Sequence, residues 1–383
     1  MSDATYVKFT AKGMVSSLGD VLNGCAAARA GLSRPAELSL AVTLADEIMP
    51  VSLNGYPCHQ VQGFQEYGRL SFLAYLAVAD LVKQFPRAAV GESSIIVNLP
   101  ASCERTSLDR QCASTGKSGR KLFSECFSNL LEARPLKLSG RSVYIFEEGG
   151  AGIGKALVSA QQILTQGKSR SCLVISVDSY LDEVTLEDFV LSGRVRTPDV
   201  SQGFLPGEGA VAVLLETSKS EAEPLAYLSS IAHDVEDYEF PLPFELFVEE
   251  ESLVDATNDD SEELEEPPVL DTPGRVYARV IESAVAHLAP EGKWLMINDL
   301  NGEVLKANEW GQMMARISSN YDFVRESEWD TPALYFGHTG SASMGVAICM
   351  SLHGAVRGYL KNHKALICGG SDRGLRAAIT LQL

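Results

Sequence analysis

The sequence predicts an α/β protein built from two similar halves. Three observations lead to this prediction. Apolar runs of strand length alternate with segments of helical periodicity along most of the chain. A strand, a glycine-rich loop, a helix and two further strands occur in this order twice, about 190 residues apart. The chain has 383 residues, which is more than a single hydrophobic core usually supports.

In the first half, the pattern predicts strands at residues 6–10, 94–98, 143–146, 172–177 and 210–215, and helices at 21–30, 70–85 and 156–164. A turn is expected directly after the first strand. Gly167 is expected to end the third helix, because glycine readily adopts the left-handed conformation that follows a helix.

In the second half, the pattern predicts strands at 294–297, 334–336, 365–368 and 377–383, and helices at 276–288 and near 344–360. The loose repeat of the first half predicts a pseudo-twofold architecture. Alternating strands and helices predict sheets that are buried between helices.

One segment carries most of the charge. Of the formal net charge of −18, residues 231–272 contribute −16, since they contain 16 Asp or Glu and no Lys or Arg, and the rest of the chain carries −2. This segment mixes acidic runs with prolines, which predicts a partly disordered insertion or linker between an N-terminal half (1–230) and a C-terminal half (273–383). The acidity argues against a nucleic-acid partner, and recruitment of a basic protein is a second hypothesis for the segment.

The composition excludes several other classes of protein. No run of about 18 apolar residues occurs, so no membrane span is expected. The chain begins Met1-Ser2-Asp3 without a basic and then apolar leader, which predicts a cytoplasmic protein. The eight cysteines form no CxxC pair, so we expect reduced thiols, no metal site and no cofactor.

Four segments in a specific order carry a family resemblance. They are Ala11-Lys-Gly-Met-Val-Ser-Ser-Leu-Gly19, Gly203-Phe-Leu-Pro-Gly-Glu-Gly-Ala210, Gly337-His-Thr-Gly-Ser-Ala-Ser-Met-Gly345 and Gly369-Gly-Ser-Asp-Arg-Gly374. In turn they resemble the opening, the GFxxGEGA strand, the GHTxxAxG segment and the last glycine-rich loop of β-ketoacyl synthases. The resemblance spans nearly the whole chain.

The resemblance implies a thiolase-like fold, in which two similar halves with mixed sheets form a five-layer αβαβα arrangement and the protein is usually a dimer. The apolar stretch 94–100 is our candidate for the edge strand of that dimer. The resemblance also implies a chemistry, which is the decarboxylative condensation of acyl thioesters by one cysteine and two histidines.

The position of the family's cysteine is occupied by Gly150. Alignment without gaps from Gly167 and the strand at 172–177 places Gly150 there, inside Glu147-Glu-Gly-Gly-Ala-Gly-Ile-Gly154. Glycine has no side chain to acylate, and Glu147 and Glu148 would raise the pKa of a nearby thiol. No Cys, Ser or Thr lies between Tyr144 and Val158.

Of the two family histidines, one has a counterpart. Asp299 stands where the first histidine belongs, and the family's lysine falls near Ala333. His338 matches the second histidine. An ionised aspartate accepts hydrogen bonds and repels a developing oxyanion, so Asp299 cannot replace a histidine as a donor. Of the family's cysteine, two histidines and lysine, only the second histidine has a counterpart here. We therefore predict that this chain does not condense acyl groups.

Other interpretations of these motifs stay open. Gly149-Gly-Ala-Gly-Ile-Gly-Lys-Ala156 nearly matches a Walker A loop, but Ala156 lacks the hydroxyl that binds magnesium. Cys103 is a candidate for a relocated nucleophile, although it lies in a loop beside Glu104. A pair of Asp299 and His338 would activate water against a thioester, with Thr339, Ser341 or Ser343 as candidate nucleophiles.

The favoured hypothesis is a catalytically inactive ketosynthase-like protein that acts as a scaffold, an adaptor or a partner subunit. Chain-length-factor subunits of polyketide synthases resemble condensing enzymes and lack the cysteine. The segment from Cys25 to Pro35 also looks like bacterial thiolase-like proteins that accompany type VI secretion effectors. We therefore expect a homodimer with a protein partner, which is an effector, a carrier protein or an active synthase. The alternative is an atypical acyl-thioester enzyme, a hydrolase, decarboxylase or acyltransferase, that acts on acyl-CoA or acyl carrier protein with His338 and Asp299.

Overall fold

The computed structural model describes residues 6–43, 50–88, 90–134, 136, 142–236, 273–288 and 292–383. The elements of the first half follow in chain order: β1 (Val7–Ser16), β2 (Gly19–Asp20), α1 (Val21–Arg29), β3 (Ala36–Val42), β4 (Val51–Gly55), η1 (His59–Val61), α2 (Glu66–Gln84), η2 (Val90–Glu92), β5 (Ser93–Leu99), η3 (Ser102–Glu104), α3 (Thr106–Thr115), α4 (Gly119–Ala133), β6 (Val143–Glu147), η4 (Gly149–Ala151), α5 (Gly152–Thr165), β7 (Ser171–Ser179), α6 (Glu183–Leu191) and β8 (Glu208–Thr217).

The remaining elements begin with the strand that opens the second half: β9 (Ala226–Val235), α7 (Arg275–Val285), β10 (Leu295–Ile297), α8 (Val304–Ile317), α9 (Asp322–Glu326), β11 (Glu328–Asp330), α10 (Ala333–Phe336), η5 (Gly340–Ala342), α11 (Ser343–Val356), β12 (Lys364–Gly370) and β13 (Leu375–Gln382).

The strand order repeats between the halves. The large sheet runs β11-β10-β12-β13-β9-β1-β8-β7-β5-β6, with β2 beside β1. Each half consists of five strands, and in both halves the three outer strands are parallel to one another while the inner strands are antiparallel. The halves join where Val7, Lys8 and Phe9 of β1 pair with Leu228, Tyr227 and Ala226 of β9. The pseudo-twofold relation expected from the sequence is therefore present.

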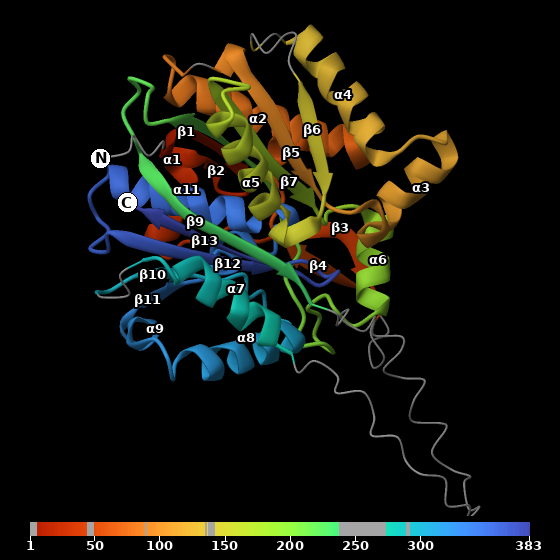
Figure 1. The fold of residues 1–383 in the computed structure, drawn as a ribbon. Helices are drawn as coiled ribbons and strands as arrows, with labels where there is room; N and C mark the ends of the chain where they lie inside the picture. The colour runs from red at the N-terminus through yellow and green to blue at the C-terminus, as the bar shows by residue number, and fades with distance from the viewer. Residues whose placement is uncertain are drawn as a thin grey trace, which may run out of the picture.

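Three hydrophobic clusters define five layers. The central cluster packs α5 and α11 between the two halves of the sheet, with Phe9 and Ile379 on its walls. A second cluster packs α2 and α4 against the outer face of the first half. A third packs α7 and α8 against the outer face of the second half. Figure 1 shows α2 and α4 at the top, α7 and α8 at the bottom, and α11 between the sheets. The αβαβα arrangement is confirmed.

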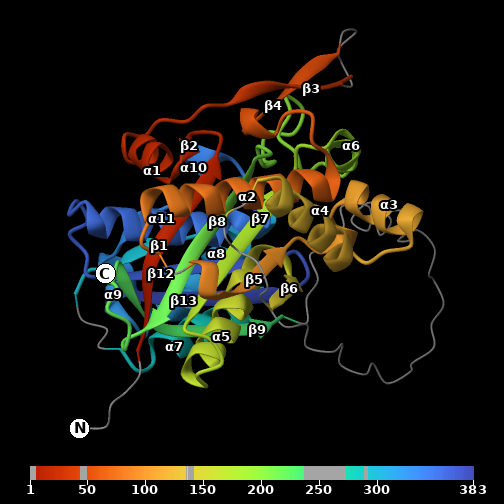
Figure 2. The same ribbon diagram turned by 90° about the horizontal axis from the view of Figure 1, so that it is seen from above.

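A small hairpin stands outside these layers. Strands β3 and β4 form a separate antiparallel sheet, and their half-buried side chains pack with α6 over a cluster that contains Leu53, Leu186 and Phe204. Figure 2 shows this hairpin and α6 projecting on the same side of the molecule.

Two local expectations are wrong. Strand β1 does not end in a turn after Thr10 but continues to Ser16, because its whole length is buried between neighbouring elements. Residues 334–336 form a helical turn, α10, and not a strand. Pro332 precedes that turn with a helical φ of −55°, and its carbonyl accepts hydrogen bonds from the N–H groups of Tyr335 and Phe336.

The expected edge strand is also wrong. Strand β5, which covers the stretch at 94–100, pairs with β7 on one side and with β6 on the other. The edge of the first half is β6, where Val143 and Tyr144 are each 42% exposed. An apolar strand such as β5 is stable in the interior of a parallel sheet because both of its faces and both of its edges are covered.

The acidic segment begins inside the large sheet, in the strand β9 of the second half. Residues 231–235 belong to β9, which pairs with β13, and Glu236 lies buried beside Arg376 at 3.3 Å. Residues 237–272 lie outside the described residues. In the described ranges, every helix is too short or too polar to cross a membrane.

Candidate functional site

The loop that contains Gly150 lies where the family's nucleophile is expected. Strand β6 ends at Glu147, η4 covers Gly149–Ala151, and α5 then runs into the central layer. Gly149 has φ of +67°, a conformation that glycine adopts without strain. Gly150 thus lies in the short turn that directly precedes the buried helix α5.

No side chain fits at Gly150. A Cβ atom built there would lie 2.7 Å from the carbonyl oxygen of Gly370, at the end of β12. Real Cβ atoms do not approach backbone oxygen so closely, and backbone yields less readily than a flexible side chain. The backbone of Gly370 therefore occupies the space that a side chain at position 150 would need.

His338 is buried and already has a partner. Its ring lies between those of Tyr180 and Phe204, with centroids 4.8 and 5.0 Å away, and its Nε2 is 2.9 Å from the Tyr180 hydroxyl. Burial, followed by the positive charge of Lys306, lowers the pKa of His338 well below its ordinary value. His338 is consequently a neutral side chain at pH 7, held by aromatic contacts and one hydrogen bond.

Asp299 pairs with a lysine and not with His338. Its Oδ2 accepts hydrogen bonds from Lys306 Nζ at 2.7 Å and from the Gly370 N–H at 2.9 Å, while Tyr277 lies 3.4 Å from Oδ1. Burial alone would lower the pKa of Lys306, but the carboxylates of Asp299 and Asp372 outweigh burial and raise it. No hydrogen bond links Asp299 to His338, so the structure does not assemble the pair that would activate a water.

The buried Arg105 and the half-buried Arg194 complete this region. Arg194 binds both oxygens of Glu303, at 2.7 and 3.3 Å, and also Asp372 at 2.9 Å. Arg105 binds both oxygens of Asp178, at 3.2 and 2.6 Å. We call these groups the His338 cluster: Arg105, Asp178, Tyr180, Arg194, Asp299, Glu303, Lys306, His338 and Asp372.

The ion pairs fix the charge state of the cluster. Burial alone would raise the pKa of Asp372, but the ion pair and hydrogen bond with Arg194 hold it well below its usual range. Asp178 also accepts hydrogen bonds from the N–H and hydroxyl of Ser341, at 2.8 and 3.1 Å. The three cations of the cluster face four carboxylates, which leaves a formal net charge of −1 and every cation paired within the protein.

Glu104 adds an unusual carboxyl group to the border of the cluster. Its Oε2 would lie 3.0 Å from a Cβ built on Gly149, and its buried Oε1 has no hydrogen-bond partner among the described residues. Burial, together with the negative charge of Asp372, raises the pKa of Glu104 to about 7. Within the described ranges, however, no three His, Cys, Asp or Glu side chains gather closely enough to hold a metal ion.

The sequence analysis missed most of this cluster. Lys306, Arg194 and Arg105 lie in segments without a motif, and their carboxylate partners are distant in sequence. Asp372 lies inside the recognised Gly369–Gly374 loop, and Asp178 directly follows the strand expected at 172–177. Only these two of the missed residues could have been suspected from their place in the sequence. The other candidates have local roles: the Thr339 and Ser343 hydroxyls are 3.1 Å apart, and Cys103 is exposed.

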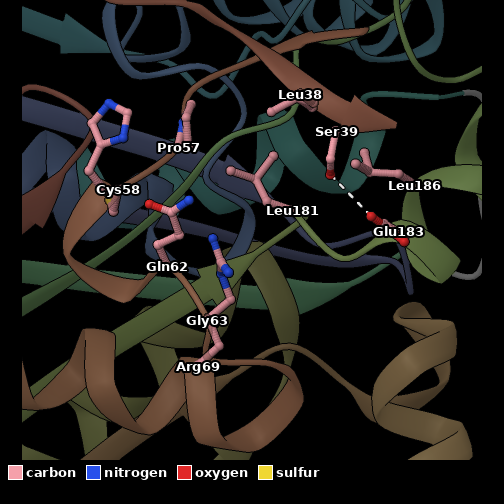
Figure 3. A pocket seen from close by; sticks show the side chains of 11 residues that line it. Leu38, Ser39, Pro57, Cys58, Gln62, Gly63, Arg69, Leu181, Glu183 and Leu186 are labelled. Carbon is pink, nitrogen blue, oxygen red and sulfur yellow. Dashed lines mark hydrogen bonds between the residues drawn. The ribbon is translucent and has the colours of Figure 1, made fainter. Parts of the chain in front are cut away.

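A separate pocket of about 250 Å³ lies under the β3–β4 hairpin. Figure 3 shows Ser39 and Glu183, which share a hydrogen bond of 3.1 Å, together with Arg69 and Cys58 around this pocket. Arg69 is already bound to both oxygens of Glu208, at 2.6 and 2.8 Å, so Glu208 of the Gly203–Ala210 segment has a structural role. The charged groups of this pocket are therefore paired within the protein.

No family model and no curated protein matches this sequence. Solved structures of ketosynthases do match the fold over nearly the full length. A structure described as the ishigamide ketosynthase/chain length factor has a TM-score of 0.65 at 18% identity, with 99% of each chain covered. A type II polyketide synthase complex, AntDE:AntF, in which an acyl-carrier protein binds its ketosynthase, has a TM-score of 0.70 at 13% identity, with 98% of each chain covered.

A β-ketoacyl synthase from Burkholderia phymatum STM815 has a TM-score of 0.64 at 14% identity, with 99% of each chain covered. At these identities the likeness concerns the fold alone. Together with the repeated strand order and the five layers, it shows that this chain has the thiolase-like fold of ketosynthases.

Proposed function

We propose that this protein is a ketosynthase-like subunit that does not condense acyl groups and acts through protein partners. The observation that carries the proposal is that position 150 is a glycine with no space for a side chain. Covalent condensation requires a nucleophile at the start of α5, and this position offers neither a side chain nor room for one beside the Gly370 carbonyl.

The His338 cluster supports the same proposal. Its cations are held by carboxylates at 2.6 to 2.9 Å: Arg105 by Asp178, Arg194 by Glu303 and Asp372, and Lys306 by Asp299. Removing one partner from a buried ion pair costs about 3–5 kcal/mol, so a substrate that displaced one would have to offset that cost. The cluster therefore favours a closed, structural interior.

The exposed edge of β6 supports association through the first half of the sheet. In the described part of the chain β6 pairs with β5 alone, and its side chains Val143 and Tyr144 are exposed. An open edge strand pairs readily with another strand, and a twofold axis allows two copies to pair with each other. We propose a homodimer through β6.

The nature of a further partner is open to experiment. The solved neighbours include a ketosynthase/chain length factor and a ketosynthase that binds an acyl-carrier protein. We propose an active synthase subunit, a carrier protein or a secreted effector as the partner classes. Isolation of the native protein with its bound partners, followed by mass spectrometry, identifies which class applies.

The competing proposal is an acyl-thioester enzyme that uses His338 and Asp299. Such a pair requires contact between the two groups, whereas His338 binds Tyr180 and Asp299 binds Lys306. No observation specifically favours this alternative.

One experiment tests both proposals. The purified chain is incubated with acyl-CoA or acyl carrier protein, and intact mass and thioester hydrolysis are measured. We expect neither an adduct nor turnover. The matched variants are His338→Ala and His353→Ala, since both histidines are 5% exposed and only His338 belongs to the cluster. A stoichiometric adduct on any residue, or hydrolysis lost in His338→Ala and retained in His353→Ala, would establish the enzyme instead.

A further inference from the structure

A cavity of about 960 Å³ lies between the C-terminal end of α2 and the turn that joins β8 to β9. Its lining includes Gln84 at the end of α2 and Phe85 directly after it, Thr10 from β1, and Glu216 near the end of β8. The other end of β8 begins at Glu208, which bonds to Ser179 beside the His338 cluster. The cavity therefore lies at the opposite end of the sheet from the cluster.

Two buried polar groups in its wall lack partners. Thr10 is 8% exposed, and its hydroxyl oxygen has no hydrogen bond with any described residue. Glu216 is 7% exposed, and its carboxylate forms neither a hydrogen bond nor an ion pair in the described ranges. The buried Thr10 hydroxyl and the Glu216 carboxylate, which opens onto the cavity, together point to a positively charged donor from outside the chain.

The nearest cation is engaged elsewhere. Lys8 lies opposite Glu216 in the β1–β8 register, but its ammonium donates to the carbonyls of Ser220 and Ala222, at 2.7 Å each. Lys12 lies over the Phe85 ring at 5.4 Å, and burial lowers its pKa. Neither lysine supplies the missing partner of Glu216.

The remaining charges of the lining favour a cation. Glu221 and Glu223 join Glu216 at the wall, against a single lining guanidinium, that of Arg87. The C-terminal end of α2 adds the partial negative charge of a helix terminus. Lys8 and Lys12 lie behind the wall and offset part of this potential.

We propose that this cavity binds an alkylammonium group, which donates hydrogen bonds to the Glu216 carboxylate and the Thr10 hydroxyl. The ammonium comes from a free polyamine or from the lysine side chain of a protein. Three N–H donors suit a site with two orphan acceptors, and the volume falls in the range of small-molecule sites.

Calorimetric titration of the full chain with spermidine, at fixed ionic strength, tests the proposal. Glu216→Gln is expected to weaken binding at least about tenfold, because a hydrogen bond to a charged group is lost. Glu132→Gln on the exposed surface of α4 removes the same charge elsewhere and is expected to bind as the parent does. A lysine peptide with blocked termini forms the second arm, and the tighter ligand of the two identifies the source of the ammonium.

A second variant guards against misfolding of Glu216→Gln. Ala222→Trp, at the half-buried rim, fills the cavity without altering a buried charge and is expected to abolish binding. If the parent binds neither ligand, or if Glu216→Gln and Glu132→Gln bind equally, the attraction comes from the overall net charge of −18 and the proposed site does not exist.

Discussion

At the scale of single residues, the space around Gly150 supports the proposal that this protein does not condense acyl groups more firmly than the absence of a thiol at this position does. A lost cysteine can be restored by one substitution, but the Gly370 carbonyl stands 2.7 Å from where any Cβ would lie. The surrounding ion pairs fix the loops that would have to move, since Lys306 binds Asp299, and Asp299 in turn accepts from the Gly370 N–H.

Restoring the cysteine is therefore expected to destabilise the protein and to restore no chemistry. Gly150→Ala and Gly150→Cys should each lower the free energy of unfolding by about 1–3 kcal/mol, the usual cost of overpacking a filled interior. Denaturant unfolding measures this change. Gly311 in α8 is the control, because nothing lies within 4 Å of its Cβ position. Gly311→Ala should stabilise the protein by up to about 1 kcal/mol. Gly150→Cys with parent-like stability and an acyl adduct would contradict our account of the site.

Glu104 is expected to make stability depend on pH. Its pKa is raised from an ordinary value of 4.5 to about 7, so folding takes up a proton between these values. The stabilisation is present below about pH 4.5 and is lost as pH rises through about 7. Glu104→Gln, which mimics the protonated form, should remove this dependence and raise the free energy of unfolding at pH 8 by roughly 1–3 kcal/mol relative to the parent.

Melting temperatures of the parent and of Glu104→Gln, measured from pH 5 to pH 8, check this prediction. The two curves should converge at the acid end and separate at the alkaline end. Parallel curves would show that the Glu104 carboxyl has an ordinary pKa, which neither burial nor the charge of Asp372 raises.

At the scale of elements, the sheet leaves β6 at its edge and covers both edges of β5. Strand β5 is more apolar than β6, so the sequence pattern alone favours β5 as the edge strand of a dimer interface. Pairing with both β6 and β7 removes its edges from solvent. The short strand β6 instead carries exposed Val143 and Tyr144 at the limit of the sheet.

A charge on β6 is expected to separate the proposed dimer. Val143→Lys places two like charges near each other across a twofold axis, and lysine is the residue by which natural edge strands avoid pairing. Light scattering should then give a mass near 41.3 kDa, whereas the parent gives twice that value. Tyr227→Lys is a suitable control, since Tyr227 is 40% exposed on β9, which pairs on both sides there. A monomeric parent would exclude the dimer, and dissociation by both variants would argue against β6 as its site.

At the scale of the whole molecule, the two ends of the acidic segment meet. Glu236 accepts a hydrogen bond from the Gly274 N–H at 3.2 Å, and its own N–H donates to Gly374 at 2.8 Å. Glu236 and Glu309 also face Arg376 in the buried interior of the second half. The residues that flank 237–272 are therefore held together by contacts among the described residues themselves.

Removal of residues 249–268 is expected to leave the fold intact. The composition of 231–272, with 16 carboxylates and no Lys or Arg, opposes compaction, and closing a long loop costs little more than closing a short one. With a short Gly/Ser linker in its place, the melting temperature should change little. Binding of a basic partner should weaken, and binding by the parent should fall with added salt. An insoluble deletion variant would mean that the segment packs as part of the structure.

The sequence by itself determined the fold class, and it predicted that Gly150 takes the place of the family's nucleophile. Strand and helix order follows from periodicity over a few residues, and the position of Gly150 follows from counting back from Gly167 along one helix. Both inferences depend on residues that are close to one another in the sequence. The motif at Gly203–Ala210 also contains Glu208, whose carboxylate binds Arg69 and Ser179 in the structure.

Only the tertiary structure decided which strand forms the edge, which charges neutralise one another and that His338 and Asp299 do not meet. Arg194 binds Glu303 and Asp372, which are 109 and 178 residues away in the sequence. Arg105 binds Asp178, which is 73 residues away. No local pattern encodes such pairs, because an ion pair depends on where two distant segments end in space and not on the residues beside each partner. For the same reason the partner of His338 is Tyr180, a residue that carried no motif.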